Sequence, residues 1–500
     1  MQITDMATPV TSVLSAQMVK SQCDFPVRKG YLLYQGVAIA LLCAAGGTYA
    51  QELEVTDASE AGVPPPGITV VPRVSMTQSF TDNVNQTTSG RQAEQITEVS
   101  PGIRVVSTAG RVKGHLDYAL RAIAYANTDR ADSFQNALDT VGTYEVVDRL
   151  LFLDFSGNIS QQAIHALGTQ SGPESYNTTN RAEVSNYRLS PYLQGHLGRQ
   201  ANYVLRVTRQ VTQSDSAAAP GTATLQSTAN FDGATPLKNL GWLVEVSRVG
   251  VDYSAGRYTE SDLSDAGLSY ALTPQFSVFA KAGIESNNYT SLDKRSYSSN
   301  DIGLKWIPSQ HMRVLASRGN RSFGDTHAVS IEYGTALVVL RFSDTRDVSA
   351  VPTAASLVPS VVGGFVVSAL SVQRKQDLEL VLRGVRGTLR FIASQSESTR
   401  VDTVSTAFDD LARAPVNQVG ARLSYLHRLS PGFNLGLATA IQRASGAPGL
   451  PDNWLREVGM SLTGKITRRS TLGVGLRHSD FTGATPYEEN AVSFNLTFEF

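Results

Sequence analysis

The side chains best placed to do chemistry are charged groups at alternate positions near residue 115. Arg111, Lys113, His115, Asp117 and Arg121 would share one face of an extended strand, because successive side chains of a strand point to opposite sides. A wet passage lined by these mostly basic groups would attract anions and screen solutes by charge. A simpler interpretation also stands: any wet interior wall carries charges of both signs.

Comparable charges occur in other alternating stretches of the chain. The basic residues that could join this ladder are Arg206, Arg341, Arg386, Arg390 and Arg477, and the acidic residues that could oppose them are Glu332, Asp377 and Glu379. Over the whole chain, 43 basic residues nearly cancel 44 acidic ones. No strongly basic field therefore points to nucleic acid as a partner.

No pattern typical of catalysis, metal binding or cofactor binding is visible. The seven histidines are scattered, and neither the zinc-protease helix motif nor the serine nucleophile elbow occurs. Residues 459–465 have the glycine and lysine spacing of a phosphate-binding loop, but Ile466 follows where Ser or Thr should bind magnesium. We therefore predict no catalytic, metal or cofactor-binding residues, no cofactor and no enzyme.

The element that must position the charged ladder is an unusually long strand. Over residues 111–125, apolar or small residues alternate with the charged ones, whereas ordinary strands run about 5–6 residues. A strand that crosses a membrane needs roughly 9–11 residues. Similar alternation recurs around Tyr203, Leu340, Leu380 and Leu435. The pattern predicts an all-β, transmembrane, antiparallel up-and-down β-barrel, with lipid on one face of each strand and a wet lumen on the other.

The carboxyl-terminal strand gives a second signal. Phe494, Leu496, Phe498 and Phe500 share one face of it, and polar residues occupy the other. Alternation that ends in an aromatic carboxyl terminus resembles the insertion signal of bacterial outer-membrane barrels. The alternative is an ordinary half-buried strand that happens to end the protein.

Turn residues separate the alternating stretches. Residues 272–278 and 429–435 are near copies of a Leu-x-Pro-containing turn, and residues 306–312 are a looser version, so we predict short periplasmic turns there. Polar residues 214–241 and 397–415 are predicted to be extracellular loops. The runs give about 16–20 strands, with 18 favoured because bacterial single-chain barrels have even strand numbers. Residues 351–370 could form a strand, an inward-folded loop or part of a plug.

The amino-terminal residues read as an export signal. A basic pair, Arg28 and Lys29, precedes an apolar run and a small-residue site at Ala50, as in a cleaved signal peptide, and the length of the region before Arg28 allows a start codon downstream of Met1. We assign residues 1–50 to the signal peptide, 51–71 to an acidic, proline-rich periplasmic leader and 72–500 to the barrel. Cleavage would remove Cys23 and Cys43, so the exported chain would hold no thiol.

Several short stretches carry a resemblance to a known family: residues 72–75, 80–84, 96–103, 116–118, 190–192 and 306–308 and the terminal Phe500. Together they resemble the outer-membrane β-barrel proteins associated with PEP-CTERM/exosortase systems. The resemblance implies a setting of exopolysaccharide production and surface-protein sorting. It carries no established activity and no catalytic residues.

Two functions of different classes follow. The first is a conduit or accessory protein in exopolysaccharide export or surface assembly, or a porin-like solute channel. The second is a structural or adhesive surface barrel with a plugged lumen, and an outer-membrane enzyme is the third alternative. We expect the protein in the Gram-negative outer membrane, with membrane lipid and the barrel-assembly machinery as partners. The family resemblance implies exopolysaccharide or its export components as further partners.

Overall fold

The structure is a computed structural model of the chain. It describes residues 67–500 except 173–179, 199–200, 217–220, 255, 350–369, 402–414, 447–451 and 484. The predicted signal peptide, residues 51–66 of the predicted leader and residues 351–369 therefore lie outside the described residues. The barrel begins at Ile68, before the predicted boundary at residue 72.

Within the described part of the chain, twenty-two strands form one sheet. They are β1 (Ile68–Thr81), β2 (Glu94–Ser107), β3 (Val112–Tyr125), β4 (Ser133–Val147), β5 (Leu151–Ala163), β6 (Arg181–Leu197), β7 (Ala201–Ser214), β8 (Thr222–Ala234), β9 (Leu240–Tyr253), β10 (Arg257–Thr273) and β11 (Phe276–Asn287). The second half comprises β12 (Arg295–Ser309), β13 (Met312–Arg321), β14 (Gly324–Gly334), β15 (Val338–Ser349), β16 (Ser371–Arg383), β17 (Gly387–Arg400), β18 (Val416–Ser430), β19 (Phe433–Ser445), β20 (Asn453–Thr467), β21 (Ser470–Thr482) and β22 (Tyr487–Glu499).

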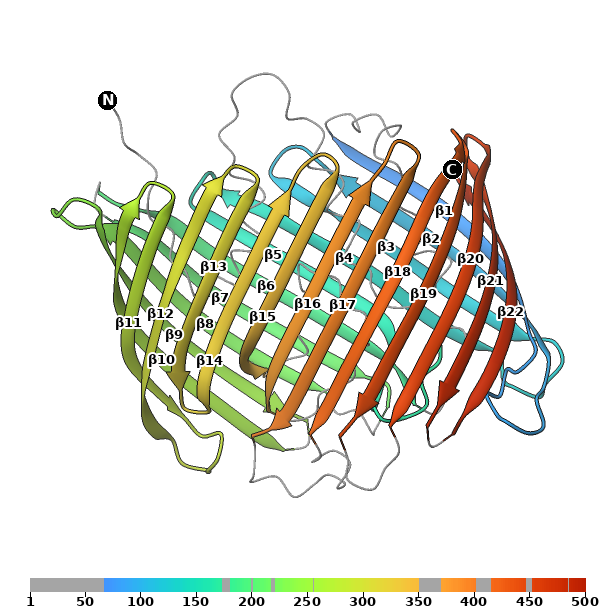
Figure 1. Cartoon of the computed structure of the whole chain (residues 1–500), viewed down its shortest axis with the longest axis horizontal. Coiled ribbons are helices and arrows are strands. Elements are labelled where there is room, and N and C mark those ends of the chain that lie inside the picture. Colours follow the sequence, from blue (N-terminus) through green and yellow to red (C-terminus); the bar gives the residue numbers. More distant parts are fainter. Residues whose placement is uncertain are drawn as a thin grey trace.

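The sheet closes on itself as an antiparallel barrel (Figure 1). Each strand pairs with the next strand of the chain, and β1 pairs with β22 in a register that sets Arg73 opposite Glu499 and Thr81 opposite Ala491. Closure leaves neither edge strand unpaired, which removes the exposed backbone donors and acceptors of an open sheet. The all-β, antiparallel barrel class is confirmed.

The predicted strand number was wrong, because the favoured value of 18 and the range of 16–20 both fall short of 22. The clearest omission is β8, which lies inside residues 214–241, a stretch predicted to be a loop. Its exterior face carries Leu225 and Phe231 but also Ala223, Ser227 and Ala229, and its interior face carries threonines, amides and Asp232. With a hydroxyl and two single methyl groups among the exterior side chains, the contrast in hydropathy between the faces is weak. The other predicted loop, residues 397–415, begins inside β17, and residues 402–414 of it are not described.

The two ends of the barrel differ in how the strands connect. At the end that also holds the carboxyl terminus, here called the turn end, hairpins close with very short turns at residues 274–275, 310–311 and 431–432. These are the turns predicted from the proline motifs. The opposite end, here called the loop end, carries longer connections such as residues 82–93 and 164–180.

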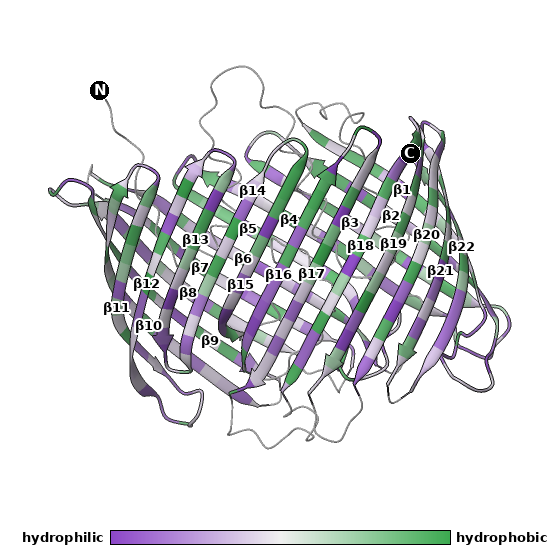
Figure 2. Cartoon of the chain, in the orientation of Figure 1, coloured by the Kyte–Doolittle hydropathy of each residue, from purple (hydrophilic) through white to green (hydrophobic). Residues whose placement is uncertain are grey.

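The two faces of the wall differ in polarity, as alternating bands in Figure 2 illustrate. On β22, the exposed Phe494 and Phe498 alternate with polar Ser493 and Thr497. On β16, Asp377 and Glu379 are buried while Leu382 on the other face is exposed. Side chains inside a closed barrel are shielded by the wall and by one another, so the buried polar face is the interior. The apolar exterior is the surface that lipid would cover.

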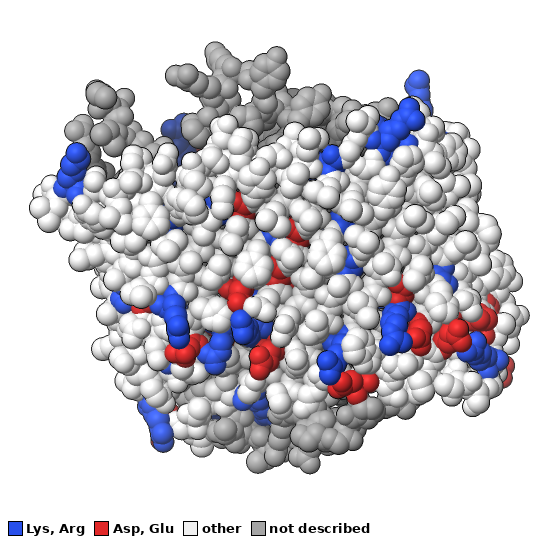
Figure 3. Space-filling model, in the orientation of Figure 1, with Lys and Arg blue, Asp and Glu red and all other residues white. Residues whose placement is uncertain are grey.

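Exterior charges are concentrated near the loop end. Figure 3 shows most charged side chains of this face in a band toward that end. Exterior cross-strand pairs near this end include Arg374 with Asp344 (3.0 Å), by the start of β16, and Arg456 with Asp480 (2.8 Å), by the start of β20. The strands therefore extend past the apolar part of the wall into a polar environment at the loop end.

Among the residues that the structure describes, no helix is long and apolar enough to cross a membrane.

Candidate functional site

The predicted basic ladder lies on and beside β3. Lys113, His115, Asp117 and Arg121 occupy the interior face of the strand, and Arg111 lies just before it in an exposed turn. Lys113 is also exposed. Val112 and Leu116, which the alternation assigned to the opposite face, are exposed on the exterior.

The interior charges of β3 do not form an uncompensated positive strip. The Arg73 guanidinium donates to both carboxylate oxygens of Asp117 at 3.0 and 2.5 Å. His115 contacts Asp139 at 3.2 Å, and Arg121 lies 3.8 Å from Glu98. Carboxylates on neighbouring strands therefore offset His115 and Arg121, whereas Arg111 and Lys113 have no carboxylate contact among the described residues. The basic character of the lumen stays a prediction.

A longer row of alternating charge crosses the opposite part of the wall. Arg313, Glu332, Arg341 and Glu379 are successive cross-strand partners on β13 to β16. Glu379 is 1% exposed and accepts hydrogen bonds from Arg341 at 2.8 Å and from Arg390 at 2.9 Å. Two further predicted interior arginines are paired, Arg206 with Asp154 and Arg477 with Glu489. Arg386 was misplaced in the prediction: it lies in the turn before β17.

One interior cluster is predominantly acidic, and sequence reasoning missed it. The Lys281 ammonium lies 3.4 Å from Glu245 and 3.9 Å from both Asp265 and Asp301, and its side chain is 4% exposed. These four residues come from four adjacent strands, β9 to β12. No local spacing could have revealed the cluster, because only the strand register brings them together.

At the loop end, part of the β5–β6 connection reaches across the interior to β20 and β22. We call residues 164–172 the mouth segment. The Asn453 side-chain amide on β20 donates to the Leu167 and Gly168 carbonyls at 2.6 and 3.2 Å. The Tyr487 hydroxyl on β22 donates to the Gln170 carbonyl at 2.6 Å. The segment therefore spans from β5 to strands near the other end of the chain.

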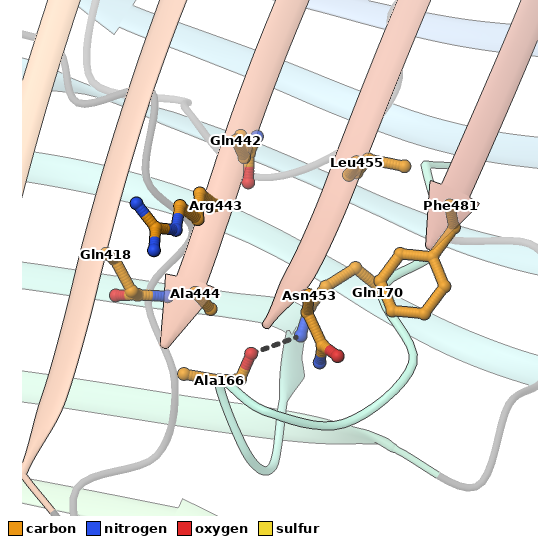
Figure 4. A pocket seen from close by; sticks show the side chains of 9 residues that line it. All are labelled: Ala166, Gln170, Gln418, Gln442, Arg443, Ala444, Asn453, Leu455 and Phe481. Carbon is orange, nitrogen blue, oxygen red and sulfur yellow. Dashed lines mark hydrogen bonds between the residues drawn. The ribbon is translucent and has the colours of Figure 1, made fainter. Parts of the chain in front are cut away.

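The mouth segment rests on interior side chains of β18 to β21. Figure 4 shows Ala166 and Gln170 among Gln418, Ala444, Leu455 and Phe481, with the Gln170 amide reaching the Ala166 carbonyl. Beneath it, Leu455, Phe481 and Tyr487 form a buried apolar cluster, in which the Phe481 and Tyr487 rings stack at 5.4 Å. Apolar packing, the hydrogen bonds from Asn453 and Tyr487, the contact between the Thr169 and Thr485 hydroxyls and a hydrogen bond from Gln86 to Ser171 thus hold the segment across the interior wall.

Two further connections at the loop end also pack against the interior. Val84 of the β1–β2 connection is buried against Ile96 and Ile123. Tyr289 of the β11–β12 connection is buried with Val251 and Tyr253, and this burial raises the pKa of its hydroxyl to about 12. The mouth segment and the β1–β2 and β11–β12 connections therefore each narrow the opening of the barrel at the loop end.

The exterior side of the β11–β12 connection is anchored by charge. The Lys294 ammonium donates to Asp262 and Glu260, each at 2.6 Å. These hydrogen bonds raise the pKa of Lys294 above its usual value. The amine therefore stays protonated throughout the neutral range, which keeps this anchor intact there.

Sequence reasoning missed the loop-end packing because apolar residues there occupy the interior face. Phe481 and Ile123 fall on the face that carries charges elsewhere on the same strands. The available signal in the sequence was that, close to a connection, apolar residues move to the face of the strand that carries charges elsewhere. In the described part of the chain, no group of three or more His, Cys, Asp or Glu residues could hold a metal ion.

Comparison with known proteins gives a fold likeness at low identity. No family model matches the chain, and no curated protein matches it. The FrpB iron transporter from Neisseria meningitidis (F5-1 variant) is 12% identical, with 93% of this chain and 87% of that chain covered and a TM-score of 0.48. The siderophore receptor PirA from Acinetobacter baumannii is 10% identical, with 86% and 80% covered and a TM-score of 0.45. These values carry no argument about function.

Proposed function

We propose that the chain is a bacterial outer-membrane barrel that conducts small polar solutes, with the mouth segment narrowing its lumen. The observation that carries the proposal is the contrast between an apolar exterior and a polar, ion-paired interior. Lipid can cover the first surface, and water can wet the second. Short turns at one end and longer loops at the other support a periplasmic turn end and an extracellular loop end.

The charge pairing bears on selectivity. Asp117, Glu379 and Glu489 each contact an arginine, and the acidic cluster around Lys281 opposes the basic Arg111 and Lys113, so charges of both signs line the interior. A conduit of this kind would discriminate by size at the mouth segment more than by charge. This proposal replaces the anion preference expected from the sequence.

A structural barrel with a closed lumen is the second candidate. The observation that favours it is the complete burial of interior carboxylates, since Glu285 and Glu489 are 0% exposed. Export of a polymer such as exopolysaccharide is a further proposal, and it rests on the family resemblance alone. In all of these proposals the protein acts without catalysis.

Weakening the contacts that hold the mouth segment tests the proposal that the barrel conducts solutes. The double change Asn453→Ala and Tyr487→Phe removes three hydrogen bonds to the segment, each with a net contribution of about 0.5–1.5 kcal/mol. We expect liposomes that contain this variant to swell severalfold faster in solutions of small sugars than liposomes with the unmodified protein.

The matched control is Asn490→Ala, which removes a side-chain hydrogen bond to Asp82 on the exterior of the same strand, β22. Its swelling rate should equal that of the unmodified protein. Equal rates for all three proteins would refute a role for the mouth segment in limiting passage.

A further inference from the structure

An apolar groove runs across the exterior of β4 to β7. It has a volume of about 410 Å³, and its lining includes Leu138, Phe155, Tyr187, Leu189 and Val211. Tyr187 and Leu189 are 44% and 49% exposed. Gly157 on β5 also lines the groove, and a Cβ there would lie 3.0 Å from Thr140 and 3.3 Å from Tyr187, so the glycine lets these two side chains close over the strand.

Arg209 borders this groove and differs from the other exterior arginines. It lies directly across from Leu189, on the exterior face of β7, and its side chain is exposed. Among the described residues it has neither an ion pair nor a hydrogen bond. By contrast, Arg248, Arg374 and Arg456, also exterior, each contact a carboxylate.

The height of Arg209 on the wall places it near one edge of the apolar band. Arg209 follows Ala201, the first residue of β7 at the turn end, by eight positions. At ~3.3 Å per residue and a tilt of ~40°, it stands about 20 Å above the turn end. The apolar band of outer-membrane barrels is about 25 Å tall, so Arg209 lies close to its loop-side boundary.

We propose that this groove binds the phosphorylated glycolipid of the outer leaflet, lipopolysaccharide. One acyl chain lies along the apolar floor beside Gly157, and the guanidinium of Arg209 donates to a headgroup phosphate. A guanidinium fits a phosphate with two parallel hydrogen bonds, and an exposed one with no carboxylate nearby is free to do so. Without an anion, a cation on the lipid-facing wall is unfavourable. The inference rests on the membrane orientation proposed above.

Native mass spectrometry of the purified full barrel in detergent tests the site. The probes are diphosphoryl lipid A, the same lipid without phosphate, and phosphatidylglycerol. We expect the unmodified protein to retain lipid A, and Arg209→Gln to retain it about tenfold more weakly, as expected for loss of a charge-assisted pair. Arg209→Lys should restore part of the retention. The matched control, Arg374→Gln, should bind as the unmodified protein does.

Each other outcome would overturn the proposal. If Arg209→Gln retains lipid A as strongly as the unmodified protein does, Arg209 does not bind the headgroup. If phosphatidylglycerol or phosphate-free lipid binds as strongly as diphosphoryl lipid A, the groove does not recognise the phosphorylated glycolipid. If the unmodified protein forms a dimer and Arg209→Gln does not, the groove binds a second copy of the chain and not a lipid. Liposome swelling distinguishes failure of this lipid site from failure of the proposed conduit. Liposomes that contain Arg209→Gln should swell as fast as liposomes that contain the unmodified protein.

Discussion

Replacement of Glu379 by alanine is expected to lower the free energy of unfolding by about 3–5 kcal/mol. The carboxylate is 1% exposed and accepts hydrogen bonds from Arg341 and Arg390. Removing it would leave the guanidinium groups of Arg341 and Arg390 without the carboxylate that both contact, and Glu332 would be the acidic cross-strand partner left to Arg341. Urea unfolding of the barrel in lipid vesicles, followed by the fluorescence of its three tryptophans, measures the loss.

The matched control is Arg374→Ala on the exterior of the same strand. Its pair with Asp344 has the same chemistry, but the Arg374 side chain is 44% exposed, so we expect a loss of at most about 1 kcal/mol. Similar small losses for both variants would contradict a buried ionic wall. They would indicate that water screens Glu379 as fully as it screens the exterior pair.

Deletion of residues 498–500 is expected to abolish insertion into the outer membrane. In the structure these residues also help to close the barrel, because Phe498 lies opposite Val74 and the Phe500 amide donates to the Pro72 carbonyl at 2.9 Å. The truncated chain should therefore lose both the predicted insertion signal and part of the β1–β22 seam. Loss of heat-modifiable gel mobility and of membrane fractionation would be the readout.

Phe500→Ser separates the two causes, since it removes the aromatic side chain and keeps the backbone amide. If the aromatic terminus is the signal, this variant should fail in cells yet refold in vesicles from the urea-denatured state. Normal insertion of the truncated chain would show that neither the terminal residues nor the seam they complete is required.

The sequence predicted the faces of individual strands better than the relations between strands. Alternation placed Leu116 and Phe498 outside and Asp117 inside, because lipid and water impose opposite demands on successive residues. It did not predict β8, where Ser227 and Ala229 separate Leu225 from Phe231 on the exterior face and weaken the alternation. Nor could it show that Asp117 pairs with Arg73, since that contact depends on a register across β1, β2 and β3.

The position of the mouth segment could not be predicted from the sequence, for a related physical reason. Residues 164–172 have no periodicity, and their partners Asn453 and Tyr487 lie 286 and 317 residues further along the chain. Only closure of the barrel brings β20 and β22 within reach of the β5–β6 connection. The interior apolar side chains at the loop end, such as Phe481, interrupt the alternation and were the one local indication of packing there.

Single-channel conductance of a redox-switchable barrel is the most direct test of the proposed conduit. Thr169 in the mouth segment and Thr485 before β22 contact each other through their hydroxyls, and cysteines at both positions would be the only thiols of a chain that starts at Gln51. These changes are combined with Asn453→Ala and Tyr487→Phe. We predict a larger conductance than that of the unmodified protein when the cysteines are reduced, and a return to the unmodified level when they are oxidised. An unmodified barrel that carries no current, or equal currents in the two redox states, would contradict a lumen limited by the mouth segment.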